Sequence, residues 1–249
     1  MMENNLQTVL ELKNITKIFG ENHVLNGFNL KLVEGESLVI MGKSGSGKSV
    51  MVKCLVGLIK PDTGTITIKG EDITSMEHKE LDILRNEIGF LFQGSALYDS
   101  MTVRENLEFP LRRRKDQSDH FTETETLVTE ALKDVGLEQT IDLMPSELSG
   151  GMQRRIALAR ALILKPKIMI YDEPTTGLDP ITAKEIIELL RNIQLKYKTS
   201  SIIITHDVDC ARVISSRMIL LVDGVNYAEG TFQELSNSDD PQIKAFFKN

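Results

Sequence analysis

The fold of this chain is decided by residues 37–50, which read SLVIMGKSGSGKSV. The apolar run 37–41 is typical of a strand that is buried on both faces. It leads into residues 42–49, GKSGSGKS, which match the phosphate-loop pattern GxxxxGK[ST] at every fixed position. A helix is predicted over residues 50–59. The order of strand, glycine-rich loop and helix therefore predicts an anion site at the start of that helix.

The residue types in this loop suit a nucleotide phosphate chain. Glycines let the backbone curl around phosphate oxygens with consecutive N–H groups pointing inward. Lys48 is placed to neutralise the β- and γ-phosphates, and the Ser49 hydroxyl to bind Mg²⁺. A glycine-rich turn with a lysine by chance is the alternative, and the flanking strand and helix argue against it. The nucleotide-binding residues assigned here are Gly42, Lys43, Ser44, Gly45, Ser46, Gly47, Lys48, Ser49 and Val50.

The rest of the chain predicts an α/β protein. Residues 9–32 alternate apolar and polar side chains on either side of a turn at 20–22, which indicates an antiparallel hairpin. Further short apolar strands are expected at 65–69, 88–92, 167–171 and 201–205, with an edge hairpin over 218–229. Between about 97 and 164 the pattern is helical: Thr122 to Glu125 resemble a capping box, and a second helix runs over 150–164. We predict a P-loop NTPase core with a mainly parallel sheet, an antiparallel β subdomain and an inserted α-helical subdomain.

Two carboxylates follow the apolar strand at 167–171. Ligands of open parallel sheets lie at the carboxyl ends of the strands, where Asp172 and Glu173 stand. Asp172 suits a Mg²⁺ role, and Glu173 is placed to polarise an attacking water. His206 follows the next strand and is a candidate γ-phosphate sensor. The alternative to a catalytic role is that the carboxylates are merely solvated and that the histidine is structural. The phosphate loop elsewhere in the chain makes this alternative the weaker one.

A second anion site is predicted at Ser149-Gly150-Gly151. Ser149 suits the N-cap of the helix that follows, and the two glycines leave backbone N–H groups bare at the positive end of the helix dipole. A capped helix whose glycines allow close packing is the alternative.

Together these residues resemble the nucleotide-binding domains of ABC transporters over essentially the whole chain. In that family Phe19 matches the aromatic residue that stacks on adenine, and Gln93 the loop glutamine that touches Mg²⁺ and faces the membrane partner. Ser149, Gly150 and Gly151 match the signature motif, which begins the signature helix, and Met152 departs from the commoner glutamine after it. Asp179 matches the loop that communicates across the dimer. The resemblance implies ATP and Mg²⁺ as ligands, with Ser49, Gln93 and Asp172 around the metal and Glu173 and His206 catalytic. It also implies a single ABC ATPase domain, with a RecA-like core and antiparallel β subdomain at about 1–94 and 165–249 and a helical subdomain at about 95–164.

The resemblance also implies a head-to-tail homodimer in which each ATP lies between one chain's phosphate loop and the other chain's signature helix. Two stretches of sequence are similar to the ATPases of MCE-associated phospholipid transporters. One runs from Gln93 to Val103 and is followed by Glu105-Asn106, and the other is Ser149-Gly150-Gly151-Met152 before Arg154-Arg155. That similarity implies an integral-membrane permease, an MCE-type lipid-binding protein and a peripheral place on the cytoplasmic face of the inner membrane. Another ABC transporter, for lipoprotein release or small-solute import, is the nearest alternative. A soluble ABC ATPase acting on ribosomes or DNA, or a regulator without turnover, is the next.

Composition narrows these choices. A formal net charge of −7 disfavours nucleic acid as a partner, because proteins that bind phosphate backbones carry an excess of Lys and Arg. The apolar runs fall far short of the roughly 20 residues that span a bilayer, so any membrane crossing is expected in another chain. Two cysteines form no disulfide framework, and we interpret them as reduced thiols. We interpret the basic run Arg112 to Lys115 as a solvated face, with lipid headgroup binding as the alternative.

Overall fold

The computed structural model describes residues 7–112 and 120–247. Contacts within the chain divide it into two compact units, residues 1–85 with 199–249 and residues 86–198. The predicted helical subdomain, about 95–164, falls inside the second unit, and the predicted boundaries at about 94 and 165 stay predictions.

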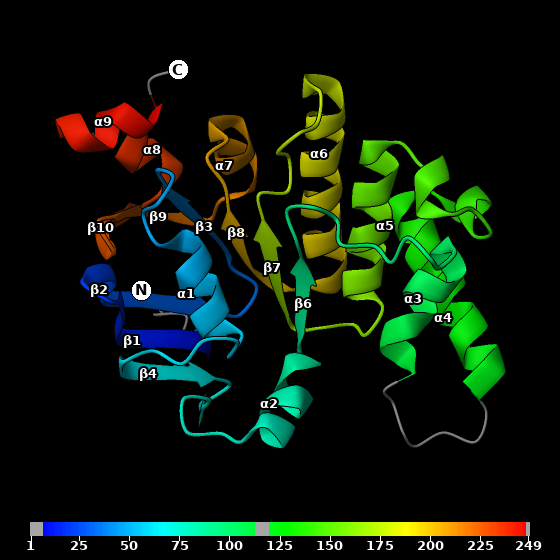
Figure 1. The fold of residues 1–249 in the computed structure, drawn as a ribbon. Helices are drawn as coiled ribbons and strands as arrows, with labels where there is room; N and C mark the ends of the chain where they lie inside the picture. Colours follow the sequence, from blue (N-terminus) through cyan, green and yellow to red (C-terminus); the bar gives the residue numbers. More distant parts are fainter. Residues whose placement is uncertain (1–6, 113–119, 248–249) are drawn as a thin grey trace. The chain divides into compact units, whose positions relative to one another are not determined.

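The first unit contains an antiparallel sheet in the order β2-β1-β4-β5 (Figure 1). It consists of β1 (Thr8–Phe19), β2 (Asn22–Val33), β4 (Thr63–Ile68) and the short β5 (Glu71–Asp72). Strands β1 and β2 form the predicted hairpin. The alternation predicted from the sequence has its physical origin here, because one face of the hairpin supplies buried residues such as Leu10, Leu12 and Leu30.

The first unit also contains four strands in the order β10-β9-β3-β8. They are β3 (Ser37–Gly42), β8 (Ser200–Ile204), β9 (Arg217–Val222) and β10 (Val225–Gly230). Strand β3 lies between β8 and β9 and is parallel to both, whereas β9 and β10 form the predicted antiparallel hairpin. Every residue of β3 and of β8 is buried. Burial on both faces explains why these strands appear in the sequence as unbroken apolar runs rather than alternating ones.

The described residues of the first unit include the helices α1 (Lys48–Leu55), α2 (His78–Arg85), α7 (Val208–Ile214), α8 (Phe232–Ser236) and α9 (Pro241–Phe247). Helix α1 begins and ends earlier than the predicted 50–59. Its end is fixed by Gly57, which has φ +68°, because the N–H of Gly57 donates to Cys54 O at 3.0 Å and the N–H of Leu58 donates to Lys53 O at 2.8 Å. A left-handed glycine after a helix closes its last turn in this way.

An ion pair ties the start of β3 to β9. Glu36 is only 8% exposed, and Arg217 donates to both of its carboxylate oxygens, at 2.7 and 3.0 Å. The N–H of Val33 also donates to Glu36, at 3.0 Å. Arg217 contacts a second carboxylate, that of Glu229, which is more exposed. The strand that carries the phosphate loop is therefore anchored at its other end by a partly buried charge network.

The second unit has a parallel strand pair and most of the helical part of the chain. Strands β6 (Ile88–Leu91) and β7 (Ile168–Asp172) are parallel. Helices α3 (Val103–Leu111), α4 (His120–Val135) and α5 (Gly150–Leu162) lie between these strands in the sequence, and α6 (Pro180–Tyr197) follows β7. Two 3₁₀ turns, Glu138–Thr140 and Pro145–Glu147, lie between α4 and α5. The predicted helical middle is confirmed. One detail was wrong: α4 begins at His120, so Thr122 lies within the helix and is not its N-cap. The apolar stripe after Thr122 defines a helix face but does not fix where the first turn begins.

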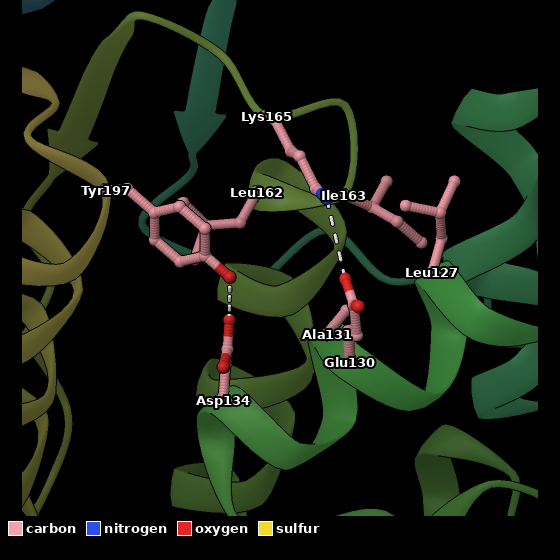
Figure 2. Close-up of a pocket in the computed structure, with 8 residues that line it drawn as sticks. All are labelled: Leu127, Glu130, Ala131, Asp134, Leu162, Ile163, Lys165 and Tyr197. Carbon is pink, nitrogen blue, oxygen red and sulfur yellow. Dashed lines mark hydrogen bonds and ion pairs between the residues drawn. The ribbon is translucent and has the colours of Figure 1, made fainter.

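Two of the polar contacts that fasten α4 to its neighbours lie beside a small pocket lined by Leu127, Glu130, Ala131, Asp134, Leu162, Ile163, Lys165 and Tyr197 (Figure 2). The Tyr197 hydroxyl, at the end of α6, donates to Asp134 of α4. Lys165 and Glu130 form an exposed ion pair at 3.5 Å. Burial, followed by the hydrogen bond to Asp134, raises the pKa of Tyr197, so the phenol stays a neutral donor at physiological pH.

Candidate nucleotide-binding and hydrolysis site

The phosphate loop lies between β3 and α1 and needs its glycines for both space and conformation. Gly47 is the N-cap of α1 with φ +105°, a region that side chains rarely adopt. A Cβ at Gly47 would lie 2.7 Å from the Val24 carbonyl oxygen of β2. A Cβ at Gly42 would lie 2.4 Å from Ser46 Oγ. The β1–β2 hairpin thus packs so closely against Gly47 that a residue with a Cβ does not fit there.

Two polar groups of the loop suit an anion. Lys48 donates from Nζ to the carbonyl oxygens of Gly42 at 2.5 Å and Lys43 at 3.0 Å, so its ammonium group lies across the loop. Ser46 Oγ is buried and has no hydrogen-bond partner among the described residues. A buried hydroxyl without a partner is costly, and a phosphate oxygen would supply the missing bond. The first turn of α1 carries no acidic side chain, so its N-terminus is open to a negative charge.

Phe19 and His206 also belong to the first unit. Phe19 ends β1 with 47% of its surface exposed, and Lys17 Nζ lies 5.4 Å from its ring centroid. An exposed ring at this place is free to stack on a planar base. His206 is exposed and follows β8 by two residues. The turn around it is ordered, because the N–H of Asp207 donates to Thr205 Oγ1 at 3.0 Å and Asp207 caps α7.

In the second unit, β7 ends at Asp172, and Glu173 follows with a left-handed backbone, φ +50°. Glu173 is 9% exposed, and Thr176 donates to it twice: from its hydroxyl to Oε2 at 3.1 Å and from its N–H to the carbonyl oxygen at 3.3 Å. A non-glycine residue in this region carries backbone strain, which is concentrated at functional sites. The turn therefore holds a nearly buried carboxylate in one orientation at a strand tip.

The predicted N-cap of α5 is confirmed. Ser149 Oγ accepts the N–H of Met152 at 3.2 Å, and Ser149 and Gly150 are both exposed. Gly151 has a different role, since a Cβ there would lie 2.6 Å from the Thr182 methyl group. The close-packing alternative thus holds for Gly151, while Gly150 leaves open backbone at the helix start.

Asp179 is the exposed N-cap of α6. It accepts the N–H groups of Ile181 at 3.0 Å and Thr182 at 3.1 Å, and the Thr182 hydroxyl at 2.5 Å. The Thr182 hydroxyl is the main cause that holds the pKa of Asp179 below its ordinary value. Thr182 thus contacts the predicted communication loop through its hydroxyl and lies against Gly151 through its methyl group. Sequence reasoning missed Thr182, and only its three-residue spacing from Asp179 signals a cap.

Gln93 is exposed and follows β6 by two residues. No group of three or more His, Cys, Asp and Glu side chains that could hold a metal occurs in the described ranges. The predicted Mg²⁺ residues Ser49, Gln93 and Asp172 include a single carboxylate. Such a set fits Mg²⁺, which is usually bound by one or two carboxylates together with substrate phosphates.

Comparison with known proteins decides the family. The model of the ABC transporter family matches residues 25–176, from β2 to the turn after Glu173. The chain belongs to the ABC transporter family. A dimeric ATP-binding cassette, MJ0796, solved with ADP and Pi, superposes with a TM-score of 0.81 at 36% identity, covering 90% of this chain and 98% of that one. This ABC ATPase therefore has the cassette fold, binds ATP and hydrolyses it, as the sequence predicts.

Relatives of this ABC ATPase serve several transport systems. It is 35% identical to the chloroplastic protein TRIGALACTOSYLDIACYLGLYCEROL 3 of Arabidopsis thaliana, over 98% of this chain and 75% of that protein. It is 36% identical to MlaF, the ATP-binding protein of an intermembrane phospholipid transport system of Haemophilus influenzae, over 97% of this chain and 91% of that protein. It is 38% identical to the methionine import ATP-binding protein MetN of Brucella abortus, over 96% of this chain and 64% of that protein. The transported substrate does not follow from identity alone.

The structure contains no helix, among those in the described residues, that is long and apolar enough to cross a membrane. Arg113 to Lys115 of the basic run lie outside the described residues.

Proposed function

We propose that this ABC ATPase energises phospholipid trafficking together with an integral-membrane permease and an MCE-type lipid-binding protein. The observation that carries the proposal is the match to MlaF, which extends over 97% of this chain and 91% of that protein. The match to MetN covers 64% of MetN, although the identity is slightly higher. The sequence after Gln93, from Gly94 to Val103, also favours phospholipid trafficking. In this role the subunit lies peripherally on the cytoplasmic face of the inner membrane.

The chemistry proposed for the site is hydrolysis of the γ-phosphate bond. Lys48 and the N-terminus of α1 hold the phosphates, and Phe19 stacks on the adenine. Glu173 accepts a proton as water attacks the γ-phosphorus, and the bond to the bridging oxygen breaks to leave ADP and phosphate. His206 contacts the γ-phosphate. Mg²⁺, held by Ser49, Gln93 and Asp172, would neutralise charge on the phosphate oxygens.

The proposed active form is a head-to-tail homodimer. Ser149, Gly150 and the start of α5 then face the ATP held on the phosphate loop of the other chain, where the open backbone at Gly150 binds phosphate oxygens. Asp179 lies at the adjoining helix start, suited to communication between the two sites. Closure on ATP and reopening after hydrolysis would move the attached permease.

The catalytic role of Glu173 is tested with Glu173→Gln, which removes the base and keeps the shape. The matched control is Glu188→Gln, an exposed carboxylate on α6. We expect the first variant to retain ATP on a filter-binding assay and lose phosphate release at least 100-fold, within the range for general base catalysis. The control should turn over as the parent does. Continued hydrolysis by Glu173→Gln would remove Glu173 from the mechanism.

The transport role is tested by affinity purification of the tagged protein from membranes, with mass spectrometry of co-purifying proteins and lipids. Recovery of a multi-span permease, an MCE-type protein and phospholipid supports the proposal. A permease with a solute-binding protein and no phospholipid would point to small-solute import instead. Ribosomal or DNA-repair proteins with no permease would indicate a soluble ABC ATPase and leave the hydrolytic assignment intact.

A further inference from the structure

Helix α5 carries a buried arginine whose partners are backbone carbonyls. Arg154 is 4% exposed and donates from Nη1 to Phe92 O at 2.7 Å and from Nη2 to Thr176 O at 3.3 Å. Burial lowers the pKa of Arg154. Its Nε has no hydrogen-bond partner among the described residues. Burying a guanidinium without a carboxylate partner costs desolvation free energy. Packing of the helix against two loops alone therefore does not explain why an arginine stands at this position.

A second arginine of α5 holds the loop that follows Gln93. Arg160 donates from Nη2 to Ala96 O at 2.7 Å and to Ser95 O at 3.3 Å, and from Nη1 to Asn106 Oδ1 at 3.2 Å. Ser95 and Ala96 have left-handed backbones, with φ of +59° and +51°. Such strain persists only where the surroundings hold it. The two arginines therefore fix the chain on both sides of Gln93, just before it at Phe92 and just after it at Ser95.

Arg154 reaches the turn at Glu173 through its second bond. Thr176, whose carbonyl oxygen it contacts, binds Glu173 through its hydroxyl and its N–H. The Arg154 side chain is thus linked by one hydrogen bond to Phe92, the residue before Gln93. It is linked to the Glu173 carboxylate by two successive hydrogen bonds through Thr176. Arg154 and Arg160 are separated by six residues, about 9 Å along the helix at 1.5 Å per residue. Helix α5, whose N-cap is Ser149, therefore holds the two arginines at a fixed spacing.

We propose that Arg154 and Arg160 are positioning residues that attach the Gln93 segment and the Glu173 turn to the signature helix, so that the three move together. The inference rests on the roles of Gln93 and Glu173 in the proposed function. A displacement of the start of α5, where Ser149 meets the phosphates of a partner's ATP, is then transmitted directly to both residues. Arg154 contacts the turn that holds Glu173, whereas Arg160 contacts the loop after Gln93 and Asn106 of α3.

The test compares Arg154→Met with Arg155→Met. Methionine retains an unbranched side chain like the aliphatic part of arginine and removes every N–H donor of the guanidinium. Arg155 is the matched control, because it is the next residue of α5 and also makes two hydrogen bonds, but to α4 and α6: it donates to Val135 O at 3.3 Å and to Glu185 at 2.6 Å. We expect Arg154→Met to lower kcat at least tenfold while the Kd for a fluorescent ATP analogue, set by the phosphate loop, changes less than twofold. Arg155→Met should leave kcat of the folded protein within twofold.

A second readout does not depend on activity. Hydrogen exchange of the amides in residues 92–102 should become faster in Arg154→Met and Arg160→Met and stay unchanged in Arg155→Met. Arg154→Lys, which keeps the charge and replaces the guanidinium with a single ammonium group, should recover part of the lost kcat; it replaces the methionine variant if that fails to fold. Equal losses of kcat in the 154 and 155 variants, or unchanged exchange over 92–102, would overturn the inference. Hydrolysis by Glu173→Gln, measured alongside, would instead refute the proposed role of Glu173 and leave the exchange result standing.

Discussion

The two carboxylates bound by Arg217 give a sharp prediction about stability. Glu36 has 8% of its side chain exposed and Glu229 has 41%, and Arg217 itself has 24%. Glu36 accepts two bonds from Arg217 and one from the Val33 N–H. Both pairs involve the same guanidinium, so replacing each carboxylate in turn isolates the effect of burial.

Glu36→Gln keeps one acceptor oxygen but turns an amide NH₂ toward a donor of Arg217. One charge-assisted bond is lost, worth about 1.5 to 3 kcal/mol, and the guanidinium loses the more buried of its two carboxylate partners. We expect a loss of about 2 to 3 kcal/mol in the free energy of unfolding. Glu229→Gln should cost less than about 1 kcal/mol, because exposed ion pairs contribute little. For a chain of this size the first loss corresponds to a fall in Tm of roughly 5 to 10 °C.

The assay is urea unfolding at pH 7, followed by far-UV circular dichroism because the chain has no tryptophan. The denaturant slope of each variant must match that of the parent for the difference to be a stability change. The double variant completes the cycle and gives the coupling between the two carboxylates. A loss for Glu36→Gln no larger than that for Glu229→Gln would refute the reasoning that burial makes this ion pair important.

Three further outcomes follow from the loops and thiols. Gly47→Ala should abolish binding of a fluorescent ATP analogue with little change in helix content, because its φ of +105° excludes a Cβ; retained binding would show that the loop adapts. Gly151→Ala should lower ATPase activity by contact with the Thr182 methyl group, and Thr182→Ser, which removes that methyl and keeps the hydroxyl on Asp179, should restore it; lack of rescue would place the defect elsewhere. Burial raises the pKa of Cys54 to about 11 and Cys210 is fully buried, so a thiol reagent at pH 8 should label neither in the native protein and both after denaturation; native labelling would indicate opening around these helices.

Much of the fold could be predicted because it is encoded over short distances along the chain. The run 37–50 predicts a buried strand, a glycine-rich loop and the start of a helix, and the structure has β3, a loop in which Gly45 and Gly47 have positive φ, and α1. Ser149 could be identified as an N-cap because a cap needs only the serine and the turn after it. The end of α1 and the start of α4 were misjudged, since apolar periodicity marks a helix face and not its first or last turn.

The sequence by itself predicted the chemistry of this protein: the residues of the phosphate loop, the carboxylates at the end of β7, the capped glycines at the start of α5, and thereby the ABC family. Those groups lie in contiguous stretches whose backbone geometry is set locally. Only the tertiary structure decided how the stretches are connected. Arg154 meets Phe92 and Thr176, Gly151 meets Thr182, and Glu36 meets Arg217 across separations of 22 to 181 residues. Such contacts leave no periodic trace in the sequence, because a single side chain makes each of them and its partner is a backbone atom or a residue chosen by packing.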